Sequence, residues 1–305
     1  MSILEIRNLR KNFGGHEILR GMSMDVPEHS IFGFVGQNGA GKTTTMKMAL
    51  GLLAPDSGHI SVCGVKVSYG DTKTNRYIGY LPDVPEYYGY MKPMEYLNLC
   101  GEITGLAKRQ IQKKGAELLS LVGLAGENRR IGGFSRGMKQ RIGIAQALLN
   151  QPRLLICDKP TSALDPIGRK EILDILLALK GKTTVVFSTH ILSDVERVCD
   201  RVAVLHRGKL ALSGTIAEIK EQHRHNGYAI EFENGSELAA FSGREELTRL
   251  PMGFTQDGYT LTLTVADTKV GGLFLIDLLV KARITPVRFE IMEPTLESLF
   301  AEVVQ

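Results

Sequence analysis

The most constraining feature of this chain is the octapeptide Gly-Gln-Asn-Gly-Ala-Gly-Lys-Thr at residues 36–43, which has the spacing GxxxxGK(S/T). It follows the apolar segment 30–35 and precedes residues 43–53, which have helical character. Glycines at this spacing let successive backbone N–H groups curve around an anion, while the lysine reaches phosphates and the hydroxyl binds Mg²⁺. The positive end of the helix adds attraction. The segment predicts a loop that binds a nucleoside triphosphate; a glycine-rich turn without a ligand is the alternative.

Eight positions in and beside this loop are candidate nucleotide contacts, and Thr43 is also a candidate Mg²⁺ ligand. The eight are Gly36, Asn38, Gly39, Ala40, Gly41, Lys42, Thr43 and Thr44.

Length and composition place the chain among ordinary globular proteins. With 305 residues, 43% of them apolar, it can form one large domain and a smaller one. The longest apolar segment, 270–280, is too short to cross a bilayer and contains Asp277. The N-terminus alternates like a strand and lacks the pattern of a signal peptide. The four cysteines lack metal-ligand spacing, so we expect buried, reduced thiols in a cytosolic protein.

Charge is distributed unevenly along the chain, whose net charge is +4. Residues 1–220 carry an excess of Lys and Arg, and residues 221–305 an excess of Asp and Glu, so we place a domain boundary in the polar segment 220–227. A basic domain could bind nucleic acid or an anionic membrane face. A phosphate site accounts for part of the charge, and no basic block with interleaved aromatic residues occurs. We therefore expect no nucleic-acid partner.

Alternating strand-like and helix-like segments in the first 220 residues predict an α/β fold with a parallel sheet. Residues 154–158 and 182–188 read as buried strands, with a helix over 168–180 between them. Asp158 comes at the end of the first strand, where ligands collect in open α/β sheets. We expect it to organise Mg²⁺, through water, as in other P-loop NTPases. A helix cap or an ion-pair acid is the alternative.

Four further short segments occur in an order that is typical of one family. They are residues 11–15 (Lys-Asn-Phe-Gly-Gly), 134–141 (Phe-Ser-Arg-Gly-Met-Lys-Gln-Arg), 162–165 (Ser-Ala-Leu-Asp) and 188–190 (Ser-Thr-His). Together with the loop, they make residues 1–220 resemble the nucleotide-binding subunit of an ATP-binding cassette transporter.

This resemblance implies roles for five residues. Phe13 matches the aromatic residue that stacks on adenine, although the family more often has Tyr there; stacking needs only a flat face. Asp165 belongs to the loop that bridges the dimer, and His190 matches the histidine that contacts the γ-phosphate. The signature usually written LSGGQ is here FSRGM, and it retains Ser135 and Gly137. These two are expected to bind the γ-phosphate of ATP held by another subunit.

The resemblance also implies an architecture for the first domain. We expect a P-loop NTPase fold with a RecA-like parallel sheet, an N-terminal antiparallel β subdomain and a helical subdomain at about 85–150, whose helix-like stretches are 93–101, 108–122 and 137–149. Tyr87, Tyr88 and Tyr90 lie on a turn-rich loop, where the family contacts the coupling helix of its membrane partner. Exposed aromatic residues suit such an interface. Surface exposure without a partner is the alternative.

Two positions depart from the family pattern. Asp83 replaces a glutamine after Leu81-Pro82; it lacks the amide donor but could attract Mg²⁺ through water. Lys159 replaces the glutamate that polarises the attacking water, and a charged lysine cannot accept a proton. Loss of a positioned base typically lowers the rate ~10²- to 10⁴-fold. We therefore expect binding of Mg-ATP and a closed dimer with slow hydrolysis; in the alternative, another residue serves as base and turnover is normal.

Residues 221–305 predict a small α+β accessory domain. Segments 228–233, 259–265 and 285–291 alternate like strands, and 269–282 and 295–304 read as helices. The ending at 293–303 is similar to the tail of bacterial ATPase subunits that serve multidrug, antibiotic or polysaccharide exporters. A generic amphipathic closing helix is the alternative.

The leading hypothesis is therefore a cytoplasmic ATPase subunit that needs ATP and Mg²⁺. We expect two partners, a separate transmembrane permease, which would hold the subunit at the cytoplasmic membrane face, and a second cassette in a homodimer or heterodimer. An ATP-driven dimerisation switch or scaffold without transport is an alternative that Lys159 favours. A cassette ATPase acting on nucleic acid or ribosomes is a third, but such proteins usually carry two cassettes or a long coiled coil.

Overall fold

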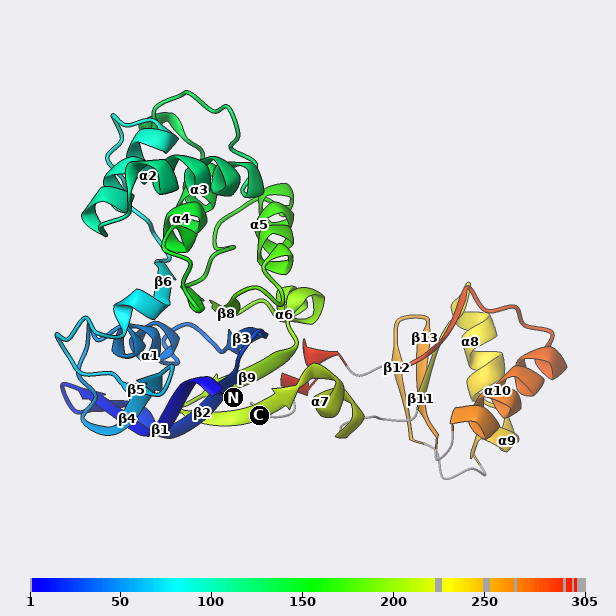
Figure 1. The fold of residues 1–305 in the computed structure, drawn as a ribbon. Coiled ribbons are helices and arrows are strands. Elements are labelled where there is room, and N and C mark those ends of the chain that lie inside the picture. Colours follow the sequence, from blue (N-terminus) through cyan, green and yellow to red (C-terminus); the bar gives the residue numbers. More distant parts are fainter. Residues whose placement is uncertain are drawn as a thin grey trace. The chain divides into compact units, whose positions relative to one another are not determined.

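The computed structural model describes residues 2–222, 227–248, 253–265, 268–292, 295–297 and 299–300. The chain forms two compact units (Figure 1), one containing the residues up to Ile216 and the other running from Ala217 to Leu299. The domain boundary predicted between residues 220 and 221 lies within helix α7 (Ile216–Gln222). Among the described helices, none is both long enough and apolar enough to cross a membrane.

A six-stranded sheet is the centre of the first unit, and it contains the two strands predicted over 154–158 and 182–188. Its order is β10 (Lys209–Thr215), β9 (Arg201–His206), β3 (Ile31–Val35), β8 (Thr184–Thr189), β7 (Leu154–Cys157) and β6 (Ile78–Leu81). The strands from β9 to β6 are parallel, and β10 joins β9 antiparallel. Every residue of β3, β7 and β8 is buried, which explains why β7 is wholly apolar and why β8 has the apolar centre Val-Val-Phe.

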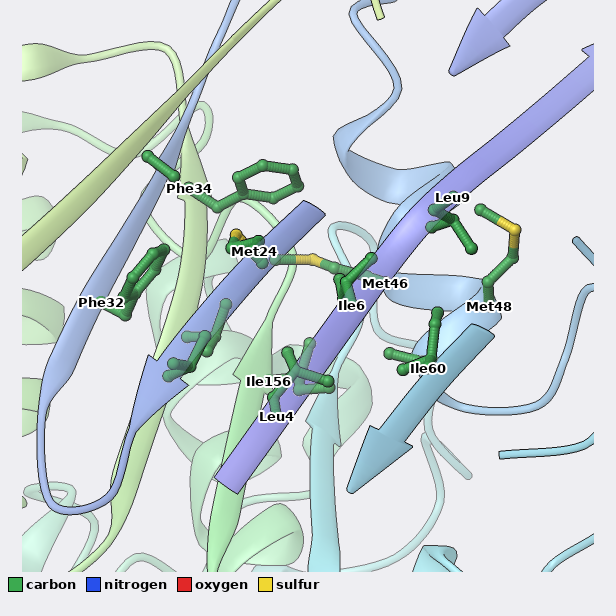
Figure 2. Packing of buried hydrophobic residues seen from close by; sticks show 14 of the residues in the cluster. Leu4, Ile6, Leu9, Met24, Phe32, Phe34, Met46, Met48, Ile60 and Ile156 are labelled. Carbon is green, nitrogen blue, oxygen red and sulfur yellow. The ribbon is translucent and has the colours of Figure 1, made fainter. Parts of the chain in front are cut away.

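An N-terminal antiparallel sheet, as predicted, packs beside the parallel one. Its order is β2 (His16–Pro27), β1 (Ser2–Phe13), β4 (Ser57–Val62) and β5 (Val65–Lys66). Helix α1 (Lys42–Ala49) lies in the same hydrophobic cluster, and Figure 2 shows its Met46 and Met48 among Ile6 and Leu9 of β1 and Ile60 of β4. This packing fixes the helix that begins at the end of the phosphate loop.

Three helices, all close to their predicted positions, pack on one another: α2 (Pro93–Ile103), α3 (Lys108–Leu121) and α4 (Arg136–Leu148). Helix α4 also contacts β6 at the sheet edge. The approach is close, because a Cβ on Gly79 would lie 2.2 Å from the carbonyl oxygen of Ala147. This unit also contains two 3₁₀ turns, η1 (Asn75–Tyr77) and η2 (Ile131–Gly133). Two further α-helices are α5 (Pro166–Ala178) and α6 (Leu192–Val198).

The second unit is an α+β domain with its own hydrophobic core, as the sequence predicts. Its antiparallel sheet has the order β12 (Phe254–Asp257), β13 (Thr260–Thr264), β11 (Gly227–Glu231) and β14 (Arg288–Ile291). Its helices are α8 (Gly235–Ser242), α9 (Glu245–Thr248) and α10 (Thr268–Ala282). Strand β12 and the helices α8 and α9 were not predicted. Of the helix predicted over 295–304, residues 298 and 301–304 lie outside the described residues.

All four cysteines lie in the first unit and are free thiols, as predicted. Only Cys157 is fully buried, and burial raises its pKa; the expectation that all four are buried is wrong for the three others, which are partly exposed.

Candidate functional site

The phosphate loop connects β3 to α1, and its glycines are required by the local geometry. A Cβ on Gly36 would lie 2.5 Å from the carbonyl oxygen of Leu205 on β9, so a side chain at this position is excluded. Gly39 and Gly41 have φ values of 83° and 109°, in the region that disfavours residues with a side chain. The loop therefore keeps its backbone close to the sheet.

Lys42 is buried and folds back onto the loop. Its Nζ donates hydrogen bonds to the carbonyl oxygens of Gly36 at 2.6 Å and Gln37 at 3.0 Å. Burial, and next the charge of Lys159, lower the pKa of Lys42 to about 8, against the opposing effect of Asp158. The loop thus holds a desolvated cation that an incoming anion stabilises.

A cavity of about 310 Å³ lies over this loop, lined by Phe13, Ile18, Gly39, residues 41–44 and Lys159. Phe13 is 46% exposed, so its ring presents a free apolar surface. Lys11 contacts this ring and an acid: its Nζ lies 5.2 Å from the Phe13 ring centroid and 2.7 Å from Asp56 Oδ1. An aromatic surface beside a phosphate cradle is suited to a nucleotide.

Asp158 is buried directly after β7, at the carboxyl end of the sheet. Its Oδ1 accepts a hydrogen bond from Ser188 Oγ at 2.6 Å, and the same hydroxyl oxygen accepts from the Lys159 N–H at 2.9 Å. Ser188 therefore orients the carboxylate and the residue after it. Ser188 has no predicted role of its own and belongs to the motif Ser-Thr-His; its place at the end of a strand neighbouring β7 is the signal that could have identified it.

The residues present fit a Mg²⁺ ion that is held partly by phosphates. No group of three or more His, Cys, Asp or Glu side chains arranged for a metal occurs among the described residues. Mg²⁺ is usually held by one or two carboxylates with substrate phosphates and water, so it needs no such group. Thr43 lines the phosphate cavity, and Asp158 follows β7, which is separated from β3 by β8 alone; a hydroxyl and a carboxylate are the donor set that this mode requires.

Asp83 and Lys159, the two departures from the family pattern, form an ion pair. Lys159 Nζ lies 3.4 Å from Asp83 Oδ2, and Arg136 Nη2 on α4 lies 3.5 Å from Asp83 Oδ1. Gln140 of α4 donates from Nε2 to the Asp83 carbonyl oxygen at 2.9 Å. This pairing was not predicted, although opposite charges that follow two adjacent strands were a signal for it.

Ser135 and Asp165 are exposed helix caps rather than parts of the phosphate cavity. Ser135 Oγ accepts from the Met138 N–H at 3.3 Å at the start of α4, and Asp165 Oδ1 accepts from the Gly168 N–H at 2.8 Å at the start of α5. His190 is exposed after β8. None of these side chains lines the cavity over the loop. Their assigned contacts with nucleotide, together with that of Gly137, remain predictions.

A buried network that the sequence analysis missed supports the segment after β7. Asp194 of α6 accepts from Thr161 Oγ1 at 3.0 Å and from Arg169 Nε at 2.6 Å. It thereby ties the turn after Lys159 to α5 and α6. A carboxylate inside a short helix after β8 gave no specific sequence signal.

Tyr87 is a structural residue, which corrects the prediction of an exposed aromatic at this position. Its hydroxyl donates to the Lys139 carbonyl oxygen at 2.7 Å, its ring meets Tyr96 edge-on, and burial raises its pKa. Tyr88 and Tyr90 are 55% and 65% exposed. The segment at residues 84–90, which carries these three tyrosines, is called the tyrosine loop. A groove of about 510 Å³ lies beside it and is lined by residues 84–87, Gly89, 131–132, Arg136 and Lys139.

Comparisons with known proteins agree with this arrangement. Residues 19–162 match the family described as ABC transporter, and residues 214–304 match the C-terminal domain of the family described as ATP-binding protein DrrA1-3-like. The uncharacterized ABC transporter ATP-binding protein YxlF of Bacillus subtilis (strain 168) is 39% identical over 303 residues, 99% of each chain. The bacitracin transport ATP-binding protein BcrA of Bacillus licheniformis is 40% identical over 228 residues, 73% of each chain.

A solved structure of the ATP binding subunit of an ABC transporter superposes with a TM-score of 0.64 and 32% identity, covering 73% of this chain and 93% of that one. The shared fold, the phosphate loop and the full-length relative lead to one conclusion. This chain belongs to the ABC transporter family and is an ATP-binding subunit of that family.

Proposed function

We propose that this subunit binds Mg-ATP between two cassettes and thereby drives a separate membrane permease in export. The observation that carries the proposal is the separation of two complementary surfaces on one chain. The phosphate loop lines one cavity together with Lys159, and the exposed start of α4 at Ser135 lies outside that cavity. A helix N-terminus attracts phosphate, so a second cassette can complete each site.

The permease would dock in the groove beside the tyrosine loop. The cavity of about 510 Å³ there is flanked by Val84, Tyr88 and Tyr90, all exposed apolar or aromatic side chains. Exposed aromatic residues around a hollow are typical of protein interfaces. Such docking would hold the subunit at the cytoplasmic face of the membrane.

The proposed cargo class is an antibiotic or a related compound. The name of the BcrA relative refers to bacitracin transport, and the second unit matches a DrrA1-3-like domain. We extend the transport of such a compound from these relatives to this chain. The permease would select the compound.

Lys159 points to slow hydrolysis. Its ammonium group occupies the position after Asp158 where a proton acceptor is expected, and it is held by Asp83. The single substitution Lys159→Glu would place a second carboxylate against Asp83. The double variant Asp83→Gln/Lys159→Glu removes this repulsion. We expect the double variant to release phosphate ~10²- to 10⁴-fold faster than the wild type, and the single variant to be intermediate.

The proposal is tested with the full chain and a candidate permease. Sedimentation of the wild-type chain, whose hydrolysis is expected to be slow, with Mg-ATP and with Mg-ADP measures dimerisation, and transport by reconstituted vesicles measures function. Dimers with ATP, together with ATP-dependent transport by the wild type, support the exporter. Absence of ATP binding contradicts the proposal. Fast wild-type hydrolysis that the double variant does not change contradicts the expectation of slow turnover.

A second candidate, an ATP-driven dimerisation switch, is favoured by the Lys159–Asp83 pair. A site that binds Mg-ATP but hydrolyses it slowly keeps the protein in the ATP-bound, dimeric state. Dimerisation with ATP and no association with any permease in the membrane fraction would support the switch in place of the exporter.

A further inference from the structure

Three charged groups connect the phosphate cavity to the groove beside the tyrosine loop. Lys159 lines the first cavity and Arg136 lines the second. The Asp83 carboxylate lies between them, with one oxygen facing each cation at 3.4 and 3.5 Å. Asp83 therefore contacts one cation from each cavity.

The Lys159–Asp83 contact is weak enough to be exchanged. Both side chains are partly exposed, at 26% and 32%, and such pairs contribute little net free energy. A phosphate oxygen offers Lys159 a stronger, charge-assisted hydrogen bond. Lys42 and Lys159 line the same cavity, so two ammonium groups border a space that an anion would occupy favourably.

The backbone allows this exchange without a large rearrangement. Lys159 has φ of 46°, and its N–H is fixed by Ser188. Asp83 is fixed through its carbonyl oxygen by Gln140 of α4. Only the flexible lysine stem has to turn, and Asp83 keeps Arg136 as a partner.

We propose that Lys159 is a second phosphate-binding lysine, and that Asp83 is the counter-ion from which the terminal phosphate of ATP withdraws it. Once released, Asp83 pairs with Arg136 alone, so that nucleotide occupancy changes the charge balance at the wall of the groove. This inference rests on the proposed function, because it requires the site to hold ATP. It also gives Lys159 a role in place of the proton acceptor that it cannot be.

The test is equilibrium binding of the full chain to Mg-AMPPNP, which resists hydrolysis, and to Mg-ADP, which lacks the terminal phosphate. Lys159→Gln should weaken Mg-AMPPNP about tenfold, the loss expected for one charge-assisted bond, and change Mg-ADP by less than about twofold. Asp83→Asn should tighten Mg-AMPPNP by roughly two- to fivefold, because the competing carboxylate is gone.

Lys73 and Asp71 provide a matched control, since they form an ion pair of the same length, 3.4 Å, and line neither cavity. Lys73→Gln and Asp71→Asn should leave both affinities unchanged. Thermal unfolding midpoints show whether each variant is folded.

Two outcomes would overturn the inference. In one, Lys159→Gln weakens both nucleotides equally or neither; in the other, Asp83→Asn fails to tighten Mg-AMPPNP. If the wild type binds neither nucleotide, the proposed function itself fails. If the wild type binds both nucleotides and only the variants depart from the expected affinities, the role inferred for Lys159 and Asp83 fails and the proposed function stands.

Discussion

Ser188 and Asp158 are joined by a hydrogen bond of 2.6 Å between the serine hydroxyl and carboxylate Oδ1, and both residues are buried. The hydroxyl oxygen also accepts the N–H of Lys159 at 2.9 Å. One side chain on β8 therefore holds two consecutive residues at the end of β7. Ser188 therefore orients the Asp158 carboxylate without a bound metal.

The first prediction concerns this serine. Ser188→Ala leaves a buried carboxylate oxygen and an N–H group without their partner, so we expect the free energy of unfolding to fall by about 1–3 kcal/mol. Mg²⁺-dependent binding of ATP should weaken as the carboxylate loses its orientation. Urea denaturation of the full chain measures the loss. The exposed Ser193, which only accepts from Arg169 at 3.2 Å, is the control; an equal effect of Ser193→Ala would contradict the assignment.

The second prediction concerns pH. The pKa of Lys42 is lowered to about 8, so the free lysine loses its proton as the pH rises through that value. A bound phosphate stabilises the charged form and raises this pKa. Binding of ATP should therefore take up almost no proton through Lys42 at pH ~7 and a larger fraction at pH ~9, with affinity falling above pH ~8.

Calorimetry in two buffers of different ionisation enthalpy measures this uptake. Lys42→Arg keeps its charge at every pH used and should abolish the pH dependence. Equal proton uptake at both pH values in the wild type would exclude Lys42 as its source.

The third prediction concerns the contact between α4 and the tyrosine loop. A Cβ on Gly143 would lie 2.4 Å from the Tyr87 hydroxyl and 2.5 Å from Leu81 Cδ1. Alanine gains about 1 kcal/mol of helix propensity, but overpacking costs about 1–3 kcal/mol, and the Tyr87 hydrogen bond to Lys139 is displaced. We expect Gly143→Ala to lower the unfolding midpoint. Gly133→Ala, where no atom lies within 4 Å of the new Cβ, should leave it unchanged.

The fourth prediction separates two roles of Ser135. Aspartate caps helices as well as serine does, so Ser135→Asp keeps the bond to the Met138 N–H and preserves stability within about 0.5 kcal/mol. Its negative charge would face the γ-phosphate of the other subunit. We expect normal binding of ATP by the monomer and loss of ATP-dependent dimers in sedimentation. Dimers as stable as those of the wild type would show that Ser135 does not contact the nucleotide.

The fifth prediction concerns the exposed ring of Phe13. Phe13→Ala should weaken ATP by about 1–3 kcal/mol if a base stacks on this ring, whereas Phe13→Tyr should bind as the wild type does. Tripolyphosphate, which has no base, should bind both variants equally. A loss of tripolyphosphate affinity in Phe13→Ala would indicate damage to the loop instead of lost stacking.

Much of this protein follows from local sequence patterns. The glycines of residues 36–43, the apolar strands around Asp158 and the helical periodicity of 93–149 are short-range signals, and the structure has strands and helices close to the predicted positions. Backbone requirements such as φ > 0 and burial of continuous apolar runs act within a few residues, so the sequence by itself determined the fold class and the phosphate loop.

The pairing of side chains was decided only by the tertiary structure. Asp83 and Lys159 are distant in sequence and meet because β6 and β7 are adjacent and parallel, with Leu81 opposite Cys157. Likewise Tyr87 is fixed because α4 approaches β6 closely. Such contacts depend on strand order and helix packing, which no local pattern encodes, and these contacts turn two isolated departures in sequence into one charged unit.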